Sequence, residues 1–100
     1  MDRHRTLLEF VLEAVANDYE SLECIVEQTT KLAQVKGFAV TRAEITRALR
    51  QRIHEKYIQP YLLSSQPPYS QKVEFYPDRI DELWFYVTPK GKKLVSSFKY

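Results

Sequence analysis

The residues best suited to chemistry in this sequence lie along one side of the segment from Thr41 to Lys56. If this segment is a helix with Ile45 at the centre of its buried face, a rotation of about 100° per residue defines the opposite face. That face carries Ala43, Arg47, Arg50, Gln51 and His54, with Thr46 on its flank. Arginine and glutamine can make paired hydrogen bonds to guanine and adenine edges, and threonine can contact a methyl group or a phosphate. The spacing predicts a helix that reads double-stranded DNA, with its four polar residues and Thr46 as base contacts.

The charge distribution favours an anionic partner for this segment. The formal net charge of the chain is only +2. Positions 1–35, however, carry three basic and seven acidic residues, a net charge of −4, whereas positions 36–56 carry six basic and two acidic residues, a net charge of +4. Basic charge concentrated in one element is typical of a surface that meets a polyanion. The alternative is an exposed helix whose arginines are only solvated.

Further basic residues are candidate phosphate contacts, which would position the protein without specifying a sequence. They are Arg42, Lys72, Arg79 and Lys90. For each lysine taken alone, a purely solubilising role is the alternative. Arg52 and Lys56 lie toward the buried side of the same helix, so we expect them to extend past the core rather than to read bases.

No group of residues has the spacing of a catalytic, metal or cofactor site. His4, His54 and Cys24 are far apart in the sequence, and the only glycines, Gly37 and Gly91, form no phosphate-binding loop. Cys24 would be a redox sensor only if its pKa were lowered, and no basic residue lies within one helical turn of it. The sequence therefore predicts a protein that is not an enzyme and that uses no metal or cofactor.

Three helices are expected in the first half of the chain. Apolar residues at positions 8, 11, 12 and 15 predict a helix over Arg5 to Ala16, and a second stripe from Leu22 to Ala33 predicts another that stops at Gly37. Thr41 to Glu44 has the pattern of a capping box, which predicts the start of the third helix. That helix is expected to end near Lys56.

One predicted strand precedes the third helix, and two more follow it. Short strands are expected at Phe38 to Val40, Tyr57 to Leu63 and Leu83 to Val87. Because proline cannot donate to a sheet ladder, Pro60 predicts that the second of these strands is an edge strand. The polar, proline-rich segment 64–82 is expected to be a loop that contains a short strand near positions 72–76. Thr88 and Pro89 then predict the start of a last helix.

This order of elements, α-α-β-α-β-loop-β-α, resembles the winged helix-turn-helix superfamily. The segment 86–94, Tyr-Val-Thr-Pro-Lys-Gly-Lys-Lys-Leu, is similar to the strand-to-helix junction of small bacterial regulators with this fold. The resemblance implies an α+β fold, a single winged-helix domain over residues 1–100, and a wing at 64–82 that is longer than usual. It also implies that the third helix enters the major groove and that the protein is a transcriptional regulator.

The aromatic residues of the second half suggest an interface. In the strand ending at Val87, Trp84 and Tyr86 share one face and Leu83 and Phe85 lie on the other. Trp84 and Tyr86 need cover from the long loop, a helix or a second subunit, so a homodimer is expected. The alternative function is a winged-helix module that binds another protein through this face and does not bind DNA. Aromatic side chains could also stack on unpaired bases, although they more often fill a core.

Composition sets the class of protein. Hydrophobic residues make up 44% and charged residues 28% of the chain, as in ordinary globular domains. No apolar run approaches the roughly 20 residues of a membrane span, and the N-terminus lacks an apolar signal segment. A single cysteine cannot form a disulfide within its own chain. These features predict a cytoplasmic protein with no membrane partner.

Overall fold

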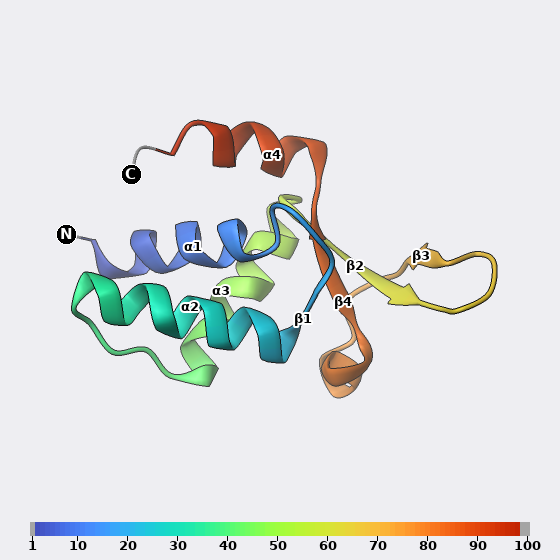
Figure 1. The fold of residues 1–100 in the computed structure, drawn as a ribbon, viewed down its shortest axis with the longest axis horizontal. Helices are drawn as coiled ribbons and strands as arrows, with labels where there is room; N and C mark the ends of the chain where they lie inside the picture. The colour runs from blue at the N-terminus through green and yellow to red at the C-terminus, as the bar shows by residue number, and fades with distance from the viewer. Residues whose placement is uncertain (1, 99–100) are drawn as a thin grey trace.

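The computed structural model describes residues 2–98, which form an α+β fold of helices and a small antiparallel sheet. In chain order the elements are α1 (Arg3–Ala14), β1 (Glu20–Ser21), α2 (Leu22–Lys36), α3 (Arg42–His54), β2 (Ile58–Leu63), β3 (Ser70–Lys72), the 3-10 helix η1 (Pro77–Glu82), β4 (Trp84–Val87) and α4 (Pro89–Ser96). The helices α1, α2 and α3 pack together, α4 lies along the outer side of α1, and the sheet extends from one end of this group (Figure 1).

The first helix begins two residues earlier than its apolar stripe predicts. Asp2 is the N-cap and accepts a hydrogen bond from the backbone N–H of Arg5, so the helix starts at Arg3 rather than at Arg5. The stripe itself is buried as expected, with Val11, Leu12 and Val15 fully inaccessible to solvent.

Gly37 at the end of α2 and Thr41 at the start of α3 are the predicted signals, whereas the N-cap of α2 was not predicted. Ser21 caps α2, and Gly37 ends it in the left-handed conformation at φ 88°, which disfavours residues that carry a Cβ. The capping box of α3 is confirmed, because Thr41 accepts from the backbone of Glu44 while Glu44 accepts from the backbone of Thr41. The helix ends at His54, two residues before the predicted end at Lys56.

The predicted strand at Phe38 to Val40 is wrong. The backbone N–H of Phe38 donates to Ala33 at the end of α2, and the Phe38 ring stacks on Phe10 of α1. The first strand is instead the two-residue β1, between α1 and α2, which pairs with β4 in the register Glu20 to Phe85. The order of elements therefore differs from the predicted one at this position.

The prediction of an edge strand from Pro60 is also wrong. The sheet order is β1-β4-β2-β3, so β2 lies in its interior. Pro60 faces Val73 at the end of the β3 ladder, where Val73 donates to the Pro60 carbonyl at 3.2 Å. The Nε2 of Gln59 donates to the Val73 carbonyl at 2.9 Å and so replaces the N–H that proline lacks. A side-chain amide thus allows proline inside the sheet.

The long segment 64–82, predicted as a loop with one short strand, contains the strand β3 and the 3-10 helix η1. The strand was expected at 72–76 but lies at Ser70–Lys72, where Ser70 pairs with Leu63 and Lys72 with Tyr61. Regular pairing ends beyond Lys72 because the next partner of the strand is Pro60. The β2-β3 hairpin projects away from the helices (Figure 1), and η1 follows it.

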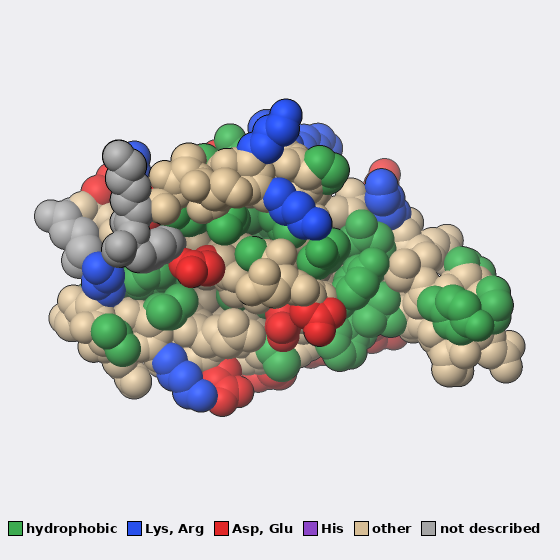
Figure 2. Space-filling model, turned by 45° about the horizontal axis from the view of Figure 1, so that its top comes forward, with side chains coloured by type: hydrophobic (Ala, Val, Ile, Leu, Met, Phe, Trp, Pro, Cys, Tyr) green, Lys and Arg blue, Asp and Glu red, His purple; other side chains and the backbone are tan. Residues whose placement is uncertain are grey.

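The two faces of β4 divide as predicted. Leu83, Phe85 and Val87 are buried in the core, whereas Trp84 retains 37% of its exposure. Tyr86 is half-buried because Tyr19 stacks on it with ring centroids 4.9 Å apart. Figure 2 shows hydrophobic side chains gathered over the sheet and, separately, at the tip of the hairpin.

Thr88 caps α4 as predicted by accepting from the backbone of Gly91, with Pro89 at the first helical position. The apolar residues of α4, Leu94 and Val95, are only half-buried. This last helix therefore packs less completely than α1, whose apolar stripe is fully buried.

Candidate nucleic-acid interface

The buried side of α3 fixes which of its residues face outward. Ile45, Ala48 and Leu49 are fully buried against α1 and the rest of the core. Four of the residues expected on the opposite side are exposed, and these are Ala43, Arg47, Arg50 and His54. The predicted orientation of this helix is confirmed, although its role is a separate question.

Two arginines dominate the outward face of α3. Among residues 2–98, neither Arg47 nor Arg50 forms an ion pair or donates a hydrogen bond to another side chain. The Arg50 guanidinium lies over the ring of Phe75, 5.5 Å from its centroid, so the segment after β3 holds it in place. Arg47 and Arg50 therefore offer their N–H groups to an external acceptor.

These arginines border a concave surface of about 670 Å³. Its lining residues are Arg42, Ala43, Thr46, Arg47 and Arg50. All five belong to α3, and the small side chain at position 43 lets an approaching group come close to the helix backbone. The concavity is open and basic rather than an enclosed apolar pocket, which suits part of a large polyanion better than a small apolar molecule.

The other two candidate base contacts are already engaged within the protein. The Thr46 hydroxyl donates to the carbonyl of Arg42 at 2.9 Å, one helical turn back, which leaves its methyl group and an oxygen lone pair for other contacts. The Gln51 side-chain oxygen lies 3.1 Å from Nε2 of His4 on α1. Gln51 thus reaches the α1 side of the interface rather than its centre.

Three of the four predicted phosphate contacts have their charge engaged. Arg42 is 2.6 Å from a carboxylate oxygen of Glu23 and 3.6 Å from one of Asp81. Arg79 pairs with Glu82 at 2.8 Å, in the neighbouring η1. In each pair the hydrogen bond from the arginine lowers the pKa of the glutamate.

The remaining two lysines differ from each other. Lys90 donates to the backbone carbonyl of Glu55 at 2.8 Å and lies over the ring of Tyr57. Lys72, on β3 of the projecting hairpin, is exposed and has no ion-pair partner among the described residues. Of the four, Lys72 is therefore the one whose charge is free to meet a phosphate.

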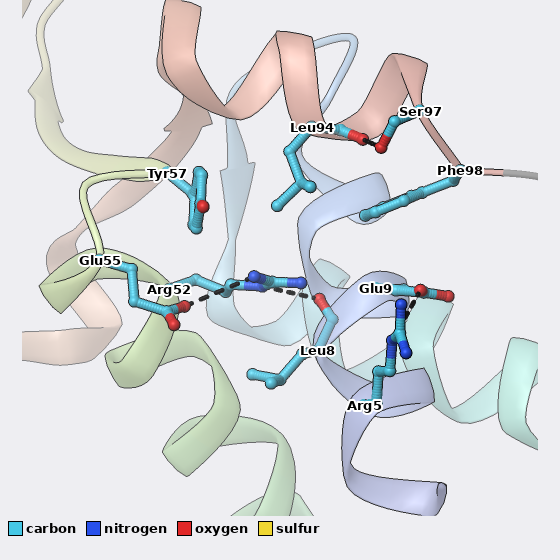
Figure 3. Close-up of a pocket in the computed structure, with 9 residues that line it drawn as sticks. All are labelled: Arg5, Leu8, Glu9, Arg52, Glu55, Tyr57, Leu94, Ser97 and Phe98. Carbon is cyan, nitrogen blue, oxygen red and sulfur yellow. Dashed lines mark hydrogen bonds and ion pairs between the residues drawn. The ribbon is translucent and has the colours of Figure 1, made fainter. Parts of the chain in front are cut away.

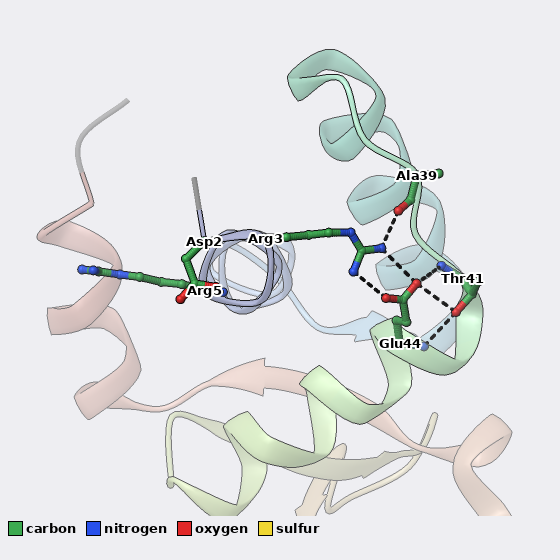
Figure 4. Close-up of polar contacts among 6 residues, drawn as sticks. All are labelled: Asp2, Arg3, Arg5, Ala39, Thr41 and Glu44. Carbon is green, nitrogen blue, oxygen red and sulfur yellow. Dashed lines mark hydrogen bonds and ion pairs between the residues drawn. The ribbon is translucent and has the colours of Figure 1, made fainter.

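A polar junction anchors the start of α3 to the start of α1 (Figure 4). Arg3 donates to both carboxylate oxygens of Glu44 and to the carbonyl of Ala39 in the turn between α2 and α3. The hydrogen bond from Arg3, aided by one from the Thr41 backbone, lowers the pKa of Glu44 to about 2. This junction fixes the orientation of the start of α3 relative to α1.

The residues that complete the interface were not evident from the sequence. Arg3 and His4 lie 41 and 47 positions from their partners on α3, and Phe75 lies 25 positions beyond Arg50. No local pattern marks such pairs, because hydrophobic periodicity reports only which side of each helix is buried.

The described residues were also searched for other kinds of site. No group of three or more His, Cys, Asp or Glu side chains within residues 2–98 could hold a metal ion. Cys24 is a half-buried free thiol on α2. No helix in the described part of the chain is both long and apolar enough to cross a membrane.

Comparison of the chain with protein-family models, with curated proteins and with solved structures found no match. The function must therefore be argued from the geometry of the interface.

Proposed function

We propose that this chain is a winged-helix protein that binds double-stranded DNA, and that it acts as a transcriptional regulator. In this proposal α3 enters the major groove, where Arg47 and Arg50 contact base edges and His54 and Gln51 extend the contact along the helix. Thr46 contributes its methyl group. Lys72 on the β2-β3 hairpin, which serves as the wing, contacts a phosphate beside the groove.

The observation that carries the proposal is the pair of unneutralised arginines on an exposed face of α3. The chain neutralises most of its other arginines through carboxylates, including Arg3, Arg42 and Arg79. Arg47 and Arg50, in the middle of α3, have no such partner among residues 2–98, whereas Arg42 in the first turn of the same helix is paired with Glu23 and Asp81. An external anion is the simplest partner for two unpaired guanidinium groups on one exposed helix face.

The rigidity of the interface also supports the proposal. The start of α3 is held by the Arg3–Glu44 junction, and its middle is held by three fully buried apolar side chains. A recognition helix that is fixed before binding loses little conformational entropy when it enters a groove.

The acidic residues of η1 limit how the duplex can approach. Asp81 lies beside Arg42 at the start of α3, and Asp78 and Glu82 are exposed nearby in the sequence. A phosphate backbone would be repelled from η1, so we expect the phosphates to lie nearer the middle and the end of α3 than to Asp81.

The test is fluorescence anisotropy of a labelled random duplex titrated with protein at several salt concentrations. The Arg47→Glu, Arg50→Glu double variant is compared with a matched Arg5→Glu, Lys93→Glu variant. Arg5 points away from α3 toward α4 (Figure 4), and Lys93 is exposed on α4. Both variants change the net charge equally, so a difference between them reports position rather than total charge.

We expect the wild type to bind with an affinity that falls steeply with salt, because neutralised phosphates release counterions. The α3 variant should lose binding, while the matched variant should bind nearly as the wild type does. Replacing Arg47 or Arg50 singly by glutamine removes one base contact and should cost about 1 to 3 kcal/mol of binding free energy at a preferred site. Equal binding by the two charge-reversed variants would overturn the assignment of α3.

A second candidate function is supported by the outer face of the sheet. Trp84 remains 37% exposed beside β1, and Tyr61 and Tyr86 lie on the same face. An exposed tryptophan among aromatic neighbours is a typical anchor of a protein interface. If no duplex binds even at low salt, a protein-interaction module that uses this face becomes the preferred function.

A further inference from the structure

A cavity of about 550 Å³ lies between α1, α3 and α4, and the side chain of Arg52 lines it (Figure 3). Leu8 of α1 and Arg52 of α3 form one side, and Tyr57, Leu94 and Phe98 form the other. It is separate from the concave surface that Arg47 and Arg50 border, because the two share no lining residue. The cavity plays no part in the proposed binding of DNA.

Arg52 is the unusual residue of this cavity. Only 7% of its surface is exposed, although arginine is rarely buried without a close charge partner. Its Nε donates to the Leu8 carbonyl at 3.1 Å, and its Nη1 lies 3.4 Å from Glu55, which is a long and weak contact. Its Nη2 donates no hydrogen bond among the described residues. The guanidinium carbon lies 5.3 Å from the centroid of the Tyr57 ring, a contact that leaves the in-plane N–H groups of Nη2 without an acceptor among the described residues.

The charges around the cavity are balanced. Arg5 and Glu9 lie at one end, with Arg5 Nε 3.9 Å from a Glu9 oxygen, and Arg52 and Glu55 lie at the other. A simple anion that bound Arg52 would also meet the Glu55 carboxylate, and a simple cation that bound Glu55 would meet Arg52. A ligand with a carboxylate and an ammonium group on the same carbon atom can place each group beside its opposite charge and so avoids both repulsions.

We propose that this cavity binds a small zwitterion, an α-amino acid with an apolar side chain. Its carboxylate accepts a hydrogen bond from Nη2 of Arg52, and its ammonium group donates to Glu55. Its side chain packs among Tyr57, Leu94 and Phe98, which supply two aromatic rings and one aliphatic wall. The half-buried state of Leu94 leaves apolar surface that such a ligand would cover.

The test is isothermal titration calorimetry of the DNA-free protein with three probes. L-Phenylalanine carries both charges, 3-phenylpropanoate lacks the ammonium group, and 2-phenylethylamine lacks the carboxylate. We expect saturable binding of L-phenylalanine and binding of each analogue weaker by about tenfold or more, because each lacks a charge-assisted hydrogen bond. Equal binding of L-phenylalanine and 3-phenylpropanoate would overturn the zwitterion.

Two variants address the site itself. Arg52→Lys keeps the charge but loses the planar fork of donors, and we expect it to weaken L-phenylalanine binding by about tenfold or more. Because Arg52 also joins α3 to α1, its substitution could weaken binding by disturbing the fold. Leu94→Trp is an independent test, since it fills the cavity and leaves Arg52 in place. Its matched control is Lys93→Trp, the neighbouring exposed position outside the cavity.

Loss of L-phenylalanine binding in Leu94→Trp, with binding retained in Lys93→Trp, would support the cavity as the site. An absence of saturable binding by the wild type would overturn the proposal, as would binding that both Arg52→Lys and Leu94→Trp leave unchanged. Since no DNA is present, none of these results depends on the proposed function of α3.

Discussion

The backbone of Gly91 in α4 packs directly against the carbonyl of Tyr57 in the turn between α3 and β2. A Cβ at position 91 would lie 2.3 Å from the Tyr57 oxygen and 2.6 Å from a methyl group of Val87. The Tyr57 oxygen cannot move freely, because it accepts the backbone N–H of Thr88 at 3.0 Å. Position 91 therefore requires glycine because the backbone of Tyr57 and the side chain of Val87 leave no room for a Cβ, and not because of its backbone angles.

We predict that Gly91→Ala destabilises the protein by about 1 to 3 kcal/mol, the usual cost of overpacking a fitted contact. The higher intrinsic helix propensity of alanine would instead stabilise the protein by about 1 kcal/mol. Whether the free energy of unfolding falls or rises therefore shows which of the two effects is larger. Urea unfolding followed by circular dichroism measures it. Lys93→Ala, on the exposed side of α4, is the control and should change stability little. A more stable Gly91→Ala variant would contradict the close approach.

Gln59 is expected to hold the base of the projecting hairpin. Its Nε2 donates to the carbonyls of Pro60 and Val73, each at 2.9 Å. Gln59→Leu should leave the Val73 carbonyl without that donor and cost about 1 kcal/mol or more. Hydrogen exchange should then show faster exchange of the amide of Val73, which donates to Pro60. Unchanged exchange at Val73 would mean that the amide bridge does not hold the hairpin.

The Arg3–Glu44 junction predicts a dependence of stability on acidity. Because Arg3 lowers the pKa of Glu44 to about 2 from an ordinary 4.5, the folded state binds this proton less readily than the unfolded state does. The stabilisation is therefore complete above about pH 4.5 and is lost as the pH falls toward about 2. Glu44→Gln should be less stable than the wild type at neutral pH, and the difference should shrink across this window.

Urea midpoints of the wild type and Glu44→Gln, measured at pH values on both sides of this window, test the junction. Arg3→Gln removes the other partner of the ion pair. In a protein that carries Arg3→Gln, adding Glu44→Gln should change the stability less than it does in the wild type, because the lowered pKa of Glu44 depends first on Arg3. A stability difference between wild type and Glu44→Gln that stays constant down to about pH 2 would refute the contribution of the ion pair.

The sequence predicted the helices well because their signals are local. Caps and apolar stripes act over one or two turns, and Thr41 and Thr88 cap α3 and α4 as the sequence predicts. The strands were less predictable. The two residues of β1 carry no alternating pattern, and their pairing with β4 is set by the path of the chain around α1. Pro60 misled the prediction because the compensating donor, Gln59, acts on a carbonyl 14 positions away.

The candidate interface was predictable in direction but not in detail. The buried face of α3 identified Arg47 and Arg50 as outward residues, since one apolar stripe determines the opposite side of a helix. Which basic residues have a neutralising partner depends on contacts between distant segments. Arg42 meets Glu23 and Asp81 only because α2 and η1 converge at the start of α3. The sequence alone gives no sign of this convergence.

The exposed tryptophan of β4 provides the last prediction. Trp84 lies opposite Ser21 on one side and Tyr61 on the other, so the small serine leaves one flank of the indole uncovered. Burying that flank against a second copy would remove apolar surface from water, which is favourable by about 25 cal/mol per Å² of apolar area. We predict that the protein is a homodimer through this face and that Trp84→Ser lowers its solution mass to that of one 11.9 kDa chain.

Sedimentation equilibrium of the wild type and Trp84→Ser measures this mass directly, with Tyr76→Ser, another exposed aromatic residue, as the control. Since Arg47 and Arg50 are on α3 and not on β4, each Trp84→Ser monomer should still bind a duplex, although without the added affinity of two linked sites. A wild type that sediments as a single chain would rule out the dimer. Its exposed Trp84 would then have to be covered by a different protein or remain in water.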